Sequence, residues 1–195
     1  ISKNPPPQIV FNAVAVDRVT SFKLLGLTIT DNLSWENHVN TVCAKAGTRL
    51  HFLKLLKRSS VTVNDLLHYY KAIIRPVIEY ACPVWQSGLT VEQRGRLETI
   101  QRRALYIISG SLDYELNCVL FNIETISTRL ETLTRSFFER ISCPVDCLNY
   151  LLPTEMPPEL INRLRRANKL PGVKCRTDRY FKSFLPYALQ NYQQY

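Results

Sequence analysis

The sequence lacks the short motifs that usually mark an enzyme. It contains no G-x-x-x-x-G-K-[ST] or G-x-G-x-x-G phosphate loop, no G-x-S-x-G nucleophile turn and no H-E-x-x-H metal helix. Two-metal phosphoryl chemistry needs two or three carboxylates clustered on a sheet. Here Asp17 and Asp31 stand alone at the ends of predicted strands, and no two aspartates are adjacent. We therefore expect this chain to have no catalytic activity of its own.

Segments for export or membrane insertion are also missing. No basic start precedes an apolar run, as it would in a signal peptide. No apolar run approaches the roughly 18 residues of a membrane-spanning helix. We therefore expect an intracellular protein, nuclear or cytoplasmic, that is neither secreted nor bound to a membrane. The first residue is Ile rather than Met, which indicates a piece of a longer chain.

The six cysteines form no clear disulfide or metal pattern. Without signs of secretion, reduced and buried thiols are the expected state. Cys143 and Cys147 form a C-x-x-x-C pair that would supply half of a structural zinc site, but no histidine follows His68. Cys175 lies far along the chain and a fourth ligand is missing. We predict no metal or other cofactor in this chain, although the sequence does not decide whether Cys143 and Cys147 bind one.

The formal net charge of +9 is unevenly distributed. Residues 35–60 carry five Lys or Arg and one acidic residue, and residues 157–195 carry eight and two. Residues 104–156 carry three basic and seven acidic residues. Solvated helix faces would explain two basic blocks around an acidic one. Two surfaces that bind a polyanion, most simply nucleic acid, would explain them equally.

The hydrophobic pattern predicts a mainly α fold. Residues 9–30 are rich in β-branched and aromatic residues, which predicts a short N-terminal antiparallel hairpin or meander with a bulge or close backbone approach at Gly26. From Ser34, the expected N-cap, apolar residues recur every three or four positions. This period predicts a bundle of about five to seven helices, the third ending at Gly110 and the fifth beginning after Ser127. The predicted helices cover residues 34–58, 63–81, 91–109, 114–120, 128–141, 158–168 and 178–193.

The stretch AIIRPVIEYACPVW, residues 72–85, interrupts the second helix. Pro76 has no backbone donor and should kink the helix near Ala72. Cys82-Pro83 should end it, because the residue before a proline avoids helical geometry. Cys82 lies in an apolar stripe, so we expect a buried, inert thiol rather than a nucleophile. The residues expected to be structural are Trp35, His38, Pro76, Tyr80, Cys82 and Trp85.

Four motifs follow one another in the order found in one family. They are F-K-x-L-G at 22–26, L-S-W-x-x-H-V at 33–39, Y-x-x-x-I-R-P-x-x-E-Y-A-x-x-x-W at 70–85 and L-E-x-I-Q-[RK]-R-A at 97–104. Over nearly its whole length the chain resembles the region that follows the catalytic palm in reverse transcriptases of non-LTR, jockey-like retrotransposons. The resemblance implies a non-catalytic C-terminal fragment of an RNA-directed DNA polymerase. The F/Y-x-D-D motif and its divalent metal would lie in a missing upstream palm.

The resemblance also implies a division of the chain and a set of partners. Residues 1–33 would be the last strands of a truncated palm, 34–110 a three-helix thumb-like bundle, 111–156 an acidic helical connector and 157–195 a basic helical tail. The expected partners are RNA, an RNA–DNA hybrid gripped by its backbone, and the rest of the reverse transcriptase. The cations expected to bind phosphates are Lys45, Arg49, Lys54, Lys57, Arg58, Arg94, Arg102, Arg103, Arg163, Arg165, Arg166, Lys169, Lys174, Arg176 and Arg179.

Other interpretations stay open at this point. The chain would also suit a helical protein-interaction module that binds no nucleic acid. Residues 22–60 resemble the short N-terminal module of AlkB-type tRNA-modifying enzymes, although the iron-binding H-x-D…H arrangement is absent. An independent enzyme would need convergent carboxylates or a Cys–His contact in a pocket.

Overall fold

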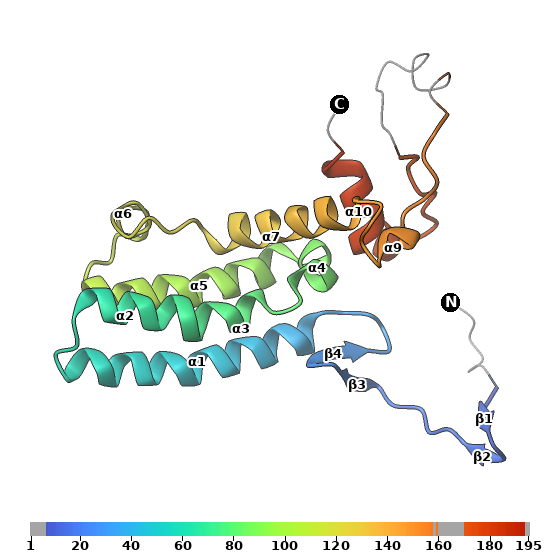
Figure 1. Cartoon of the computed structure of the whole chain (residues 1–195). Helices are drawn as coiled ribbons and strands as arrows, with labels where there is room; N and C mark the ends of the chain where they lie inside the picture. Colours follow the sequence, from blue (N-terminus) through green and yellow to red (C-terminus); the bar gives the residue numbers. More distant parts are fainter. Residues whose placement is uncertain (1–6, 158, 160–169, 194–195) are drawn as a thin grey trace.

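The computed structural model describes residues 7–157, 159 and 170–193 (Figure 1). The prediction of a mainly helical fold with a short antiparallel β segment at its start is confirmed. No helix in those ranges is both long and apolar enough to span a bilayer. The elements are β1 (Val10–Phe11), β2 (Val14–Ala15), β3 (Ser21–Leu24), β4 (Leu27–Thr30), α1 (Glu36–Arg58), α2 (Val63–Tyr69), η1 (Tyr70–Ile74), α3 (Arg75–Glu79), α4 (Cys82–Trp85), η2 (Gln86–Gly88), α5 (Val91–Ser109), α6 (Tyr114–Leu120), α7 (Ile126–Ile141), η3 (Asn149–Leu151), α9 (Asp178–Phe181) and α10 (Phe184–Asn191).

Two separate hairpins precede the helices. β1 pairs with β2, and β3 pairs with β4 in the register Ser21 opposite Thr30. Leu25 and Gly26 connect β3 to β4 with φ values of 46° and 85°, as a tight two-residue hairpin turn requires. The prediction of a bulge or a close backbone at Gly26 is therefore wrong. The close approach comes from a side chain, since a Cβ on Gly26 would lie 3.1 Å from the Tyr80 ring.

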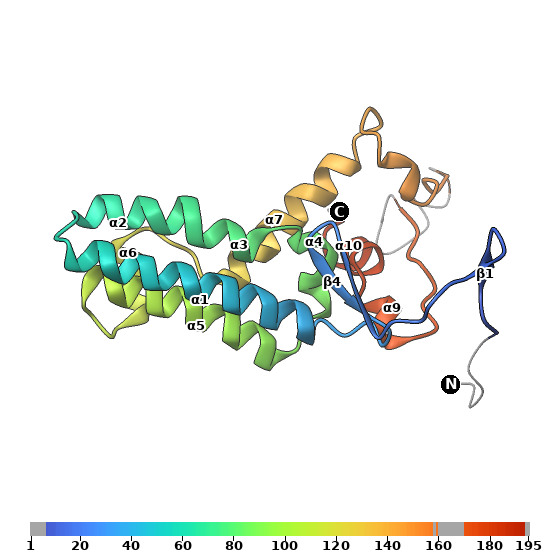
Figure 2. The ribbon, with the colours of Figure 1, turned by 90° about the horizontal axis from the view of Figure 1, so that it is seen from below.

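The main body is built on α1, the α2–η1–α3 arm and α5, which share one apolar core. Glu36 at the start of α1 contacts Arg96 near the start of α5, and Lys57 at the end of α1 contacts Ile108 near the end of α5. The two helices are therefore parallel. The α2–η1–α3 arm, which lies between them in the sequence, runs in the opposite direction and brings the chain back to the start of α5. The arm also contacts α5 directly, since the Tyr70 hydroxyl donates to Gln101. In the view from below, α1 lies in front of the groove between the arm and α5 (Figure 2).

The turn before Pro76 departs from regular α-helical hydrogen bonding. Residues 70–74 form the π-helical turn η1, in which the Arg75 backbone N–H donates to the carbonyl of Tyr70. This wider turn accommodates the missing donor of Pro76. The prediction that the helix continues to Ala81 is wrong, because α3 ends at Glu79 and Ala81 adopts a left-handed φ of 50°. Cys82-Pro83 begins the short helix α4 instead of ending a helix, since proline fits the first helical turn.

The other boundaries follow local capping groups. α5 spans the predicted residues, with a Thr90–Gln93 capping box at its start and left-handed Gly110 at its end. α7 begins two residues earlier than predicted, because Thr125 rather than Ser127 caps it. The N-cap position of α1 is Trp35 and not Ser34, although the Ser34 hydroxyl accepts from the Glu36 N–H at 3.3 Å.

The end of the chain differs from its prediction in one respect. A single helix was expected over residues 178–193, and two shorter helices, α9 and α10, are found there. Ser183 separates them because its backbone is extended, with a ψ of 160°. The helix predicted for residues 158–168 lies almost entirely outside the described residues.

Candidate nucleic-acid interface

The five predicted phosphate-binding cations of α1 do not share one face. Lys45 and Lys54 are about two and a half helical turns apart, so they lie on opposite sides of the helix. Lys45 lies on the side of the α2–η1–α3 arm, together with Arg49. Lys54, Lys57 and Arg58 lie toward α5. Any one ligand surface on α1 therefore includes only part of the predicted set.

Arg49 has a partner within the fold. Its guanidinium donates to the carbonyl of Ile73, at the edge of the π-helical turn before Pro76. The Tyr69 hydroxyl in turn donates to the Arg49 carbonyl at 3.5 Å. Arg49 thus stabilises the arm at the point where regular helical hydrogen bonding is interrupted.

The exposed seam between α1 and α5 gathers most of the remaining cations. At one end of this seam, Arg96 pairs with Glu36 at 2.6 Å. Lys54 follows Glu36 by about five helical turns and Arg103 follows Arg96 by about two, so both lie on the same side of the bundle. Among the described residues, Lys54 and Arg103 have no ion pair or hydrogen-bond partner for their side chains. We call Lys54, Lys57, Arg58 and Arg103 the seam cations.

Two features give the seam its shape. The Lys57 ammonium donates to the Ile108 carbonyl at 2.8 Å, which joins the ends of the two helices. Gly47 lies between the two ends, about three turns after Glu36, and a Cβ there would meet nothing within 4 Å. The surface beside the seam cations is therefore open.

Arg94 and Arg102, the other predicted cations of α5, lie on the side away from α1. Arg94 donates to the Gln86 carbonyl at 3.0 Å and lines a hollow of about 530 Å³ beside α7, together with Glu131 and Arg135. Arg102 lies over the Tyr114 ring, 5.1 Å from its centroid. Neither belongs to the seam.

The predicted cations of the tail are only partly described. Lys174 and Arg176 are exposed, and Arg179 donates to the carbonyl of Asn32, next to the β3–β4 hairpin. Arg179 therefore lies at the hairpin end of the bundle, away from the seam cations. The remaining four predicted cations, Arg163, Arg165, Arg166 and Lys169, lie outside the described residues.

His38 is buried between two tryptophans. Its ring centroid lies 6.0 Å from that of Trp35 and 5.4 Å from that of Trp85, both in edge-on geometry. Its Nδ1 accepts from the Thr28 backbone N–H at 3.4 Å, so it joins α1 to the hairpin. Burial, and secondarily the charge of Lys45, lowers the pKa of His38, which keeps the imidazole neutral.

Tyr80 and Cys82 also serve the packing of the hairpin and α4. The Tyr80 hydroxyl donates to the Leu25 carbonyl at 2.7 Å, and the Trp85 indole N–H donates to the Tyr80 carbonyl at 3.0 Å. The Cys82 side chain is in the core, and burial raises the pKa of its thiol to about 11. At neutral pH the thiol is therefore protonated, which makes it a poor nucleophile.

A buried polar network was missed in the sequence. The Tyr70 hydroxyl donates to the side chain of Gln101, whose amide donates to the Tyr114 hydroxyl at 2.7 Å and to the Glu124 carbonyl at 2.9 Å. Tyr114 in turn donates to the Glu98 carboxylate. The sequence signal for this network was the position of Gln101, because a polar residue four positions after Leu97 lies on the inward face of α5 and needs buried partners.

Glu98 extends this network to the next helix. Its carboxylate accepts from the backbone N–H groups of Ile126 and Ser127, at 3.1 and 3.3 Å, in the first turn of α7. A carboxylate at a helix N-terminus is stabilising because it satisfies free donors and opposes the helix dipole. Near the same end of α7, Arg129 pairs with Glu79 at 2.8 Å, and Glu79 also pairs with Arg75 at 3.0 Å.

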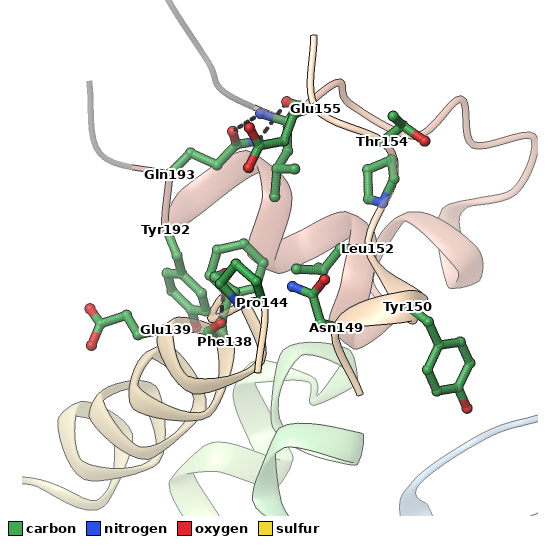
Figure 3. Close-up of a pocket in the computed structure, with 13 residues that line it drawn as sticks. Phe138, Glu139, Pro144, Asn149, Tyr150, Leu152, Thr154, Glu155, Tyr192 and Gln193 are labelled. Carbon is green, nitrogen blue, oxygen red and sulfur yellow. Dashed lines mark hydrogen bonds between the residues drawn. The ribbon is translucent and has the colours of Figure 1, made fainter. Parts of the chain in front are cut away.

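A cavity of about 670 Å³ lies between the end of α7, η3 and the residues around Tyr192 (Figure 3). Phe138, Leu152 and Tyr192 give it an apolar side, while the Tyr150 ring is turned away from it. None of the predicted site residues lines this cavity. Across residues 7–157, 159 and 170–193, no group of three or more His, Cys, Asp or Glu side chains could hold a metal ion.

Comparison with known proteins identifies relatives of one kind. The probable RNA-directed DNA polymerase from transposon X-element of Drosophila melanogaster is 23% identical over 84% of this chain and 18% of its own length. The polymerase from mobile element jockey of Drosophila funebris is 21% identical over 69% of this chain and 15% of its own length. The probable polymerase from transposon BS of Drosophila melanogaster is 22% identical over 81% and 18%.

The chain thus spans less than a fifth of the length of these relatives. No protein-family model matches the sequence, and no solved structure matches it. The motifs and the curated relatives nevertheless indicate the same family. Over most of its length and at low identity, the chain is homologous to RNA-directed DNA polymerases of non-LTR retrotransposons.

Proposed function

We propose that this chain is a non-catalytic, thumb-like part of a longer RNA-directed DNA polymerase and that it holds the template RNA–DNA hybrid by its phosphates. The observation that carries the proposal is the gathering of the seam cations along one exposed side of α1 and α5. The relatives support the choice of ligand, because all three are named as RNA-directed DNA polymerases. In this proposal the polymerase carboxylates and their metal ions belong to the rest of the longer protein.

Phosphate contacts make a specific physical prediction. Each neutralised phosphate releases condensed counterions, so the logarithm of the affinity falls with that of the salt concentration by about 0.9 for each contact. Lys57 already donates to the Ile108 carbonyl, so the other three seam cations should give a slope of about −3 on a hybrid duplex. Because phosphates carry no sequence information, affinity should hardly depend on sequence.

The test measures binding of the 195-residue chain to a fluorescent RNA–DNA hybrid by anisotropy over a range of salt concentrations. Arg103→Glu and Lys54→Glu should each lower affinity several-fold and reduce the salt slope by about 1. Lys45→Glu is the matched control, because it reverses a charge that is also exposed but lies on the opposite side of α1. Binding without salt dependence, or an equal loss in the Lys45→Glu control, would show that the seam is not the contact surface.

We also propose that the hairpins contact the rest of the longer polymerase. Every residue of β1, β2 and β3 is exposed, and their apolar side chains include Phe11 and Phe22, which are 71% and 61% exposed. Sheets of two strands are rarely stable without a covering layer. The chain matches less than a fifth of each relative's length, and in this proposal the covering layer comes from the rest of the longer polymerase.

A further inference from the structure

Helix α9 presents two aromatic rings to solvent. Tyr180 and Phe181 are 45% and 43% exposed, and neither ring stacks on another aromatic ring within the described chain. Phe184, three residues after Phe181, behaves differently, because it packs edge-on against Phe137 with ring centroids 5.2 Å apart. Of these three aromatic residues, Phe184 packs against the core at this end of the molecule, whereas Tyr180 and Phe181 remain exposed.

The backbone of α9 is fixed to the bundle on both sides. The Thr177 hydroxyl caps it by accepting from the Tyr180 N–H at 3.2 Å. Arg179 donates to the carbonyl of Asn32, and the Ser87 hydroxyl donates to the carbonyl of Lys182 at 2.7 Å. In Figure 2 α9 lies at the same end of the molecule as the β3–β4 hairpin, and the Arg179 contact joins it to Asn32, just after β4. The backbone that carries the two exposed rings is therefore anchored to the bundle.

The segment that carries these rings has a net positive charge. Residues 174–182 contain four cations and a single acid, Asp178, which pairs with Lys182 at 2.8 Å. Exposed aromatic rings within a cationic surface are the combination that binds single-stranded nucleic acid, because rings stack on bases while cations follow the phosphates. A duplex offers no free base faces along its length, so the rings would contribute little to a hybrid.

We propose that α9 is a stacking site for unpaired bases of a single-stranded nucleic acid, with Tyr180 and Phe181 as the stacking residues. Lys174 and Arg176 supply the neighbouring charge. The inference rests on the proposed nucleic-acid function but concerns a second site. α1 alone is about 33 Å long, so α9 and the seam cations lie at opposite ends of the bundle. Duplex and single strand would be held at different places.

The test compares two ligands, an oligouridine and the RNA–DNA hybrid, for the full chain. Tyr180→Ala and Phe181→Ala should each weaken oligouridine binding about tenfold and leave hybrid binding within twofold. Tyr180→Phe and Phe181→Trp keep a ring and should retain binding. The added indole of Phe181→Trp should also lose fluorescence when oligouridine stacks on it. Tyr150→Ala, which removes a tyrosine that is 77% exposed, should change neither affinity.

The outcomes separate the two proposals. A wild-type chain that binds neither ligand overturns the nucleic-acid function as a whole. Salt-dependent hybrid binding, combined with unchanged oligouridine affinity in Tyr180→Ala and Phe181→Ala, overturns the α9 site alone. The site is also overturned if the indole of Phe181→Trp is unaffected by saturating oligouridine. Loss of binding to the remainder of the polymerase in these variants, with normal RNA binding, would assign α9 to a protein contact.

Discussion

Replacing Gln101 by Leu tests whether the buried polar network joins the helices. Gln101 is 0% exposed, and its side chain links Tyr70, Tyr114 and the Glu124 carbonyl. Leucine has a similar volume and no polar atoms, so it would fill the space and leave partners unsatisfied. Tyr70 is also 0% exposed, and its hydroxyl would lose its acceptor.

The expected magnitude follows from the groups that are left without partners. The Tyr114 hydroxyl retains Glu98, whereas the Tyr70 hydroxyl and the Glu124 carbonyl lose the partners described above. A buried group left unsatisfied costs about 1–3 kcal/mol. Tyr70 is fully buried whereas Glu124 lies at an exposed position, so the Tyr70 hydroxyl sets the cost, and the free energy of unfolding should fall by about 1–3 kcal/mol. That is a large fraction of the ~5–15 kcal/mol by which domains are usually stable.

Urea unfolding followed by far-UV circular dichroism measures this loss. Tyr70→Phe in the Gln101→Leu background should recover at least about 1 kcal/mol, because it removes the orphaned hydroxyl. In the wild-type background the same change should destabilise the protein. Gln190→Leu, at an exposed position of α10, is the control and should stay within about 0.5 kcal/mol. A similarly small effect of Gln101→Leu, or equal costs of Tyr70→Phe in both backgrounds, would refute the role of the network.

Two further predictions concern His38 and the β3–β4 hairpin. Burial lowers the pKa of His38 below its ordinary 6.5, so the unfolded chain binds a proton that the folded chain does not, and stability should fall as pH drops below about 6.5. Urea midpoints measured at neutral and mildly acidic pH should show this fall in the wild type and a smaller fall in His38→Gln. An equal fall in both proteins would exclude His38 as the source. Phe22→Ser should change the stability of this chain by less than about 0.5 kcal/mol but destabilise the longer polymerase by about 1–3 kcal/mol. Val91→Ser, at another exposed apolar position, is the control. An equal effect of Phe22→Ser in both proteins would contradict the proposed contact.

The sequence was most informative where a periodic apolar face was long. α5 was predicted to the residue, because nineteen residues of regular spacing lie between a threonine cap and a glycine. Prediction was less accurate where neighbouring residues could perform the same local role. Thr125 and Ser127 are both good N-caps, and tertiary contacts decide between them, since Glu98 accepts from the Ile126 and Ser127 N–H groups.

Long-range partners were not accessible to pattern analysis. The Arg49 side chain satisfies a carbonyl 24 residues away in sequence, and Arg179 reaches Asn32 across 147 residues. Counting cations along the chain treats these arginines in the same way as Lys54, which has no partner among the described residues. Only the folded arrangement separates cations that stabilise the backbone from cations that remain available to a ligand.

The motif L-E-x-I-Q-[RK]-R-A shows how this distinction sharpens the candidate site. Leu97, Ile100 and Ala104 are in the core, while Glu98 and Gln101 form the polar network. The first arginine of the motif, Arg102, lies over Tyr114. Each of these positions therefore has a role in the packed scaffold of this chain.

Arg103 is the exception within that motif. It is exposed, and the described part of the chain offers its guanidinium no acceptor. A scaffold role gives no reason for an arginine there, because an exposed and unpaired side chain contributes little to stability. A phosphate ligand does give a reason, since guanidinium groups bind phosphate oxygens in bidentate fashion. If Arg103→Lys, which keeps the charge, binds the hybrid more weakly than the wild type, the planar group and not the charge alone makes the contact.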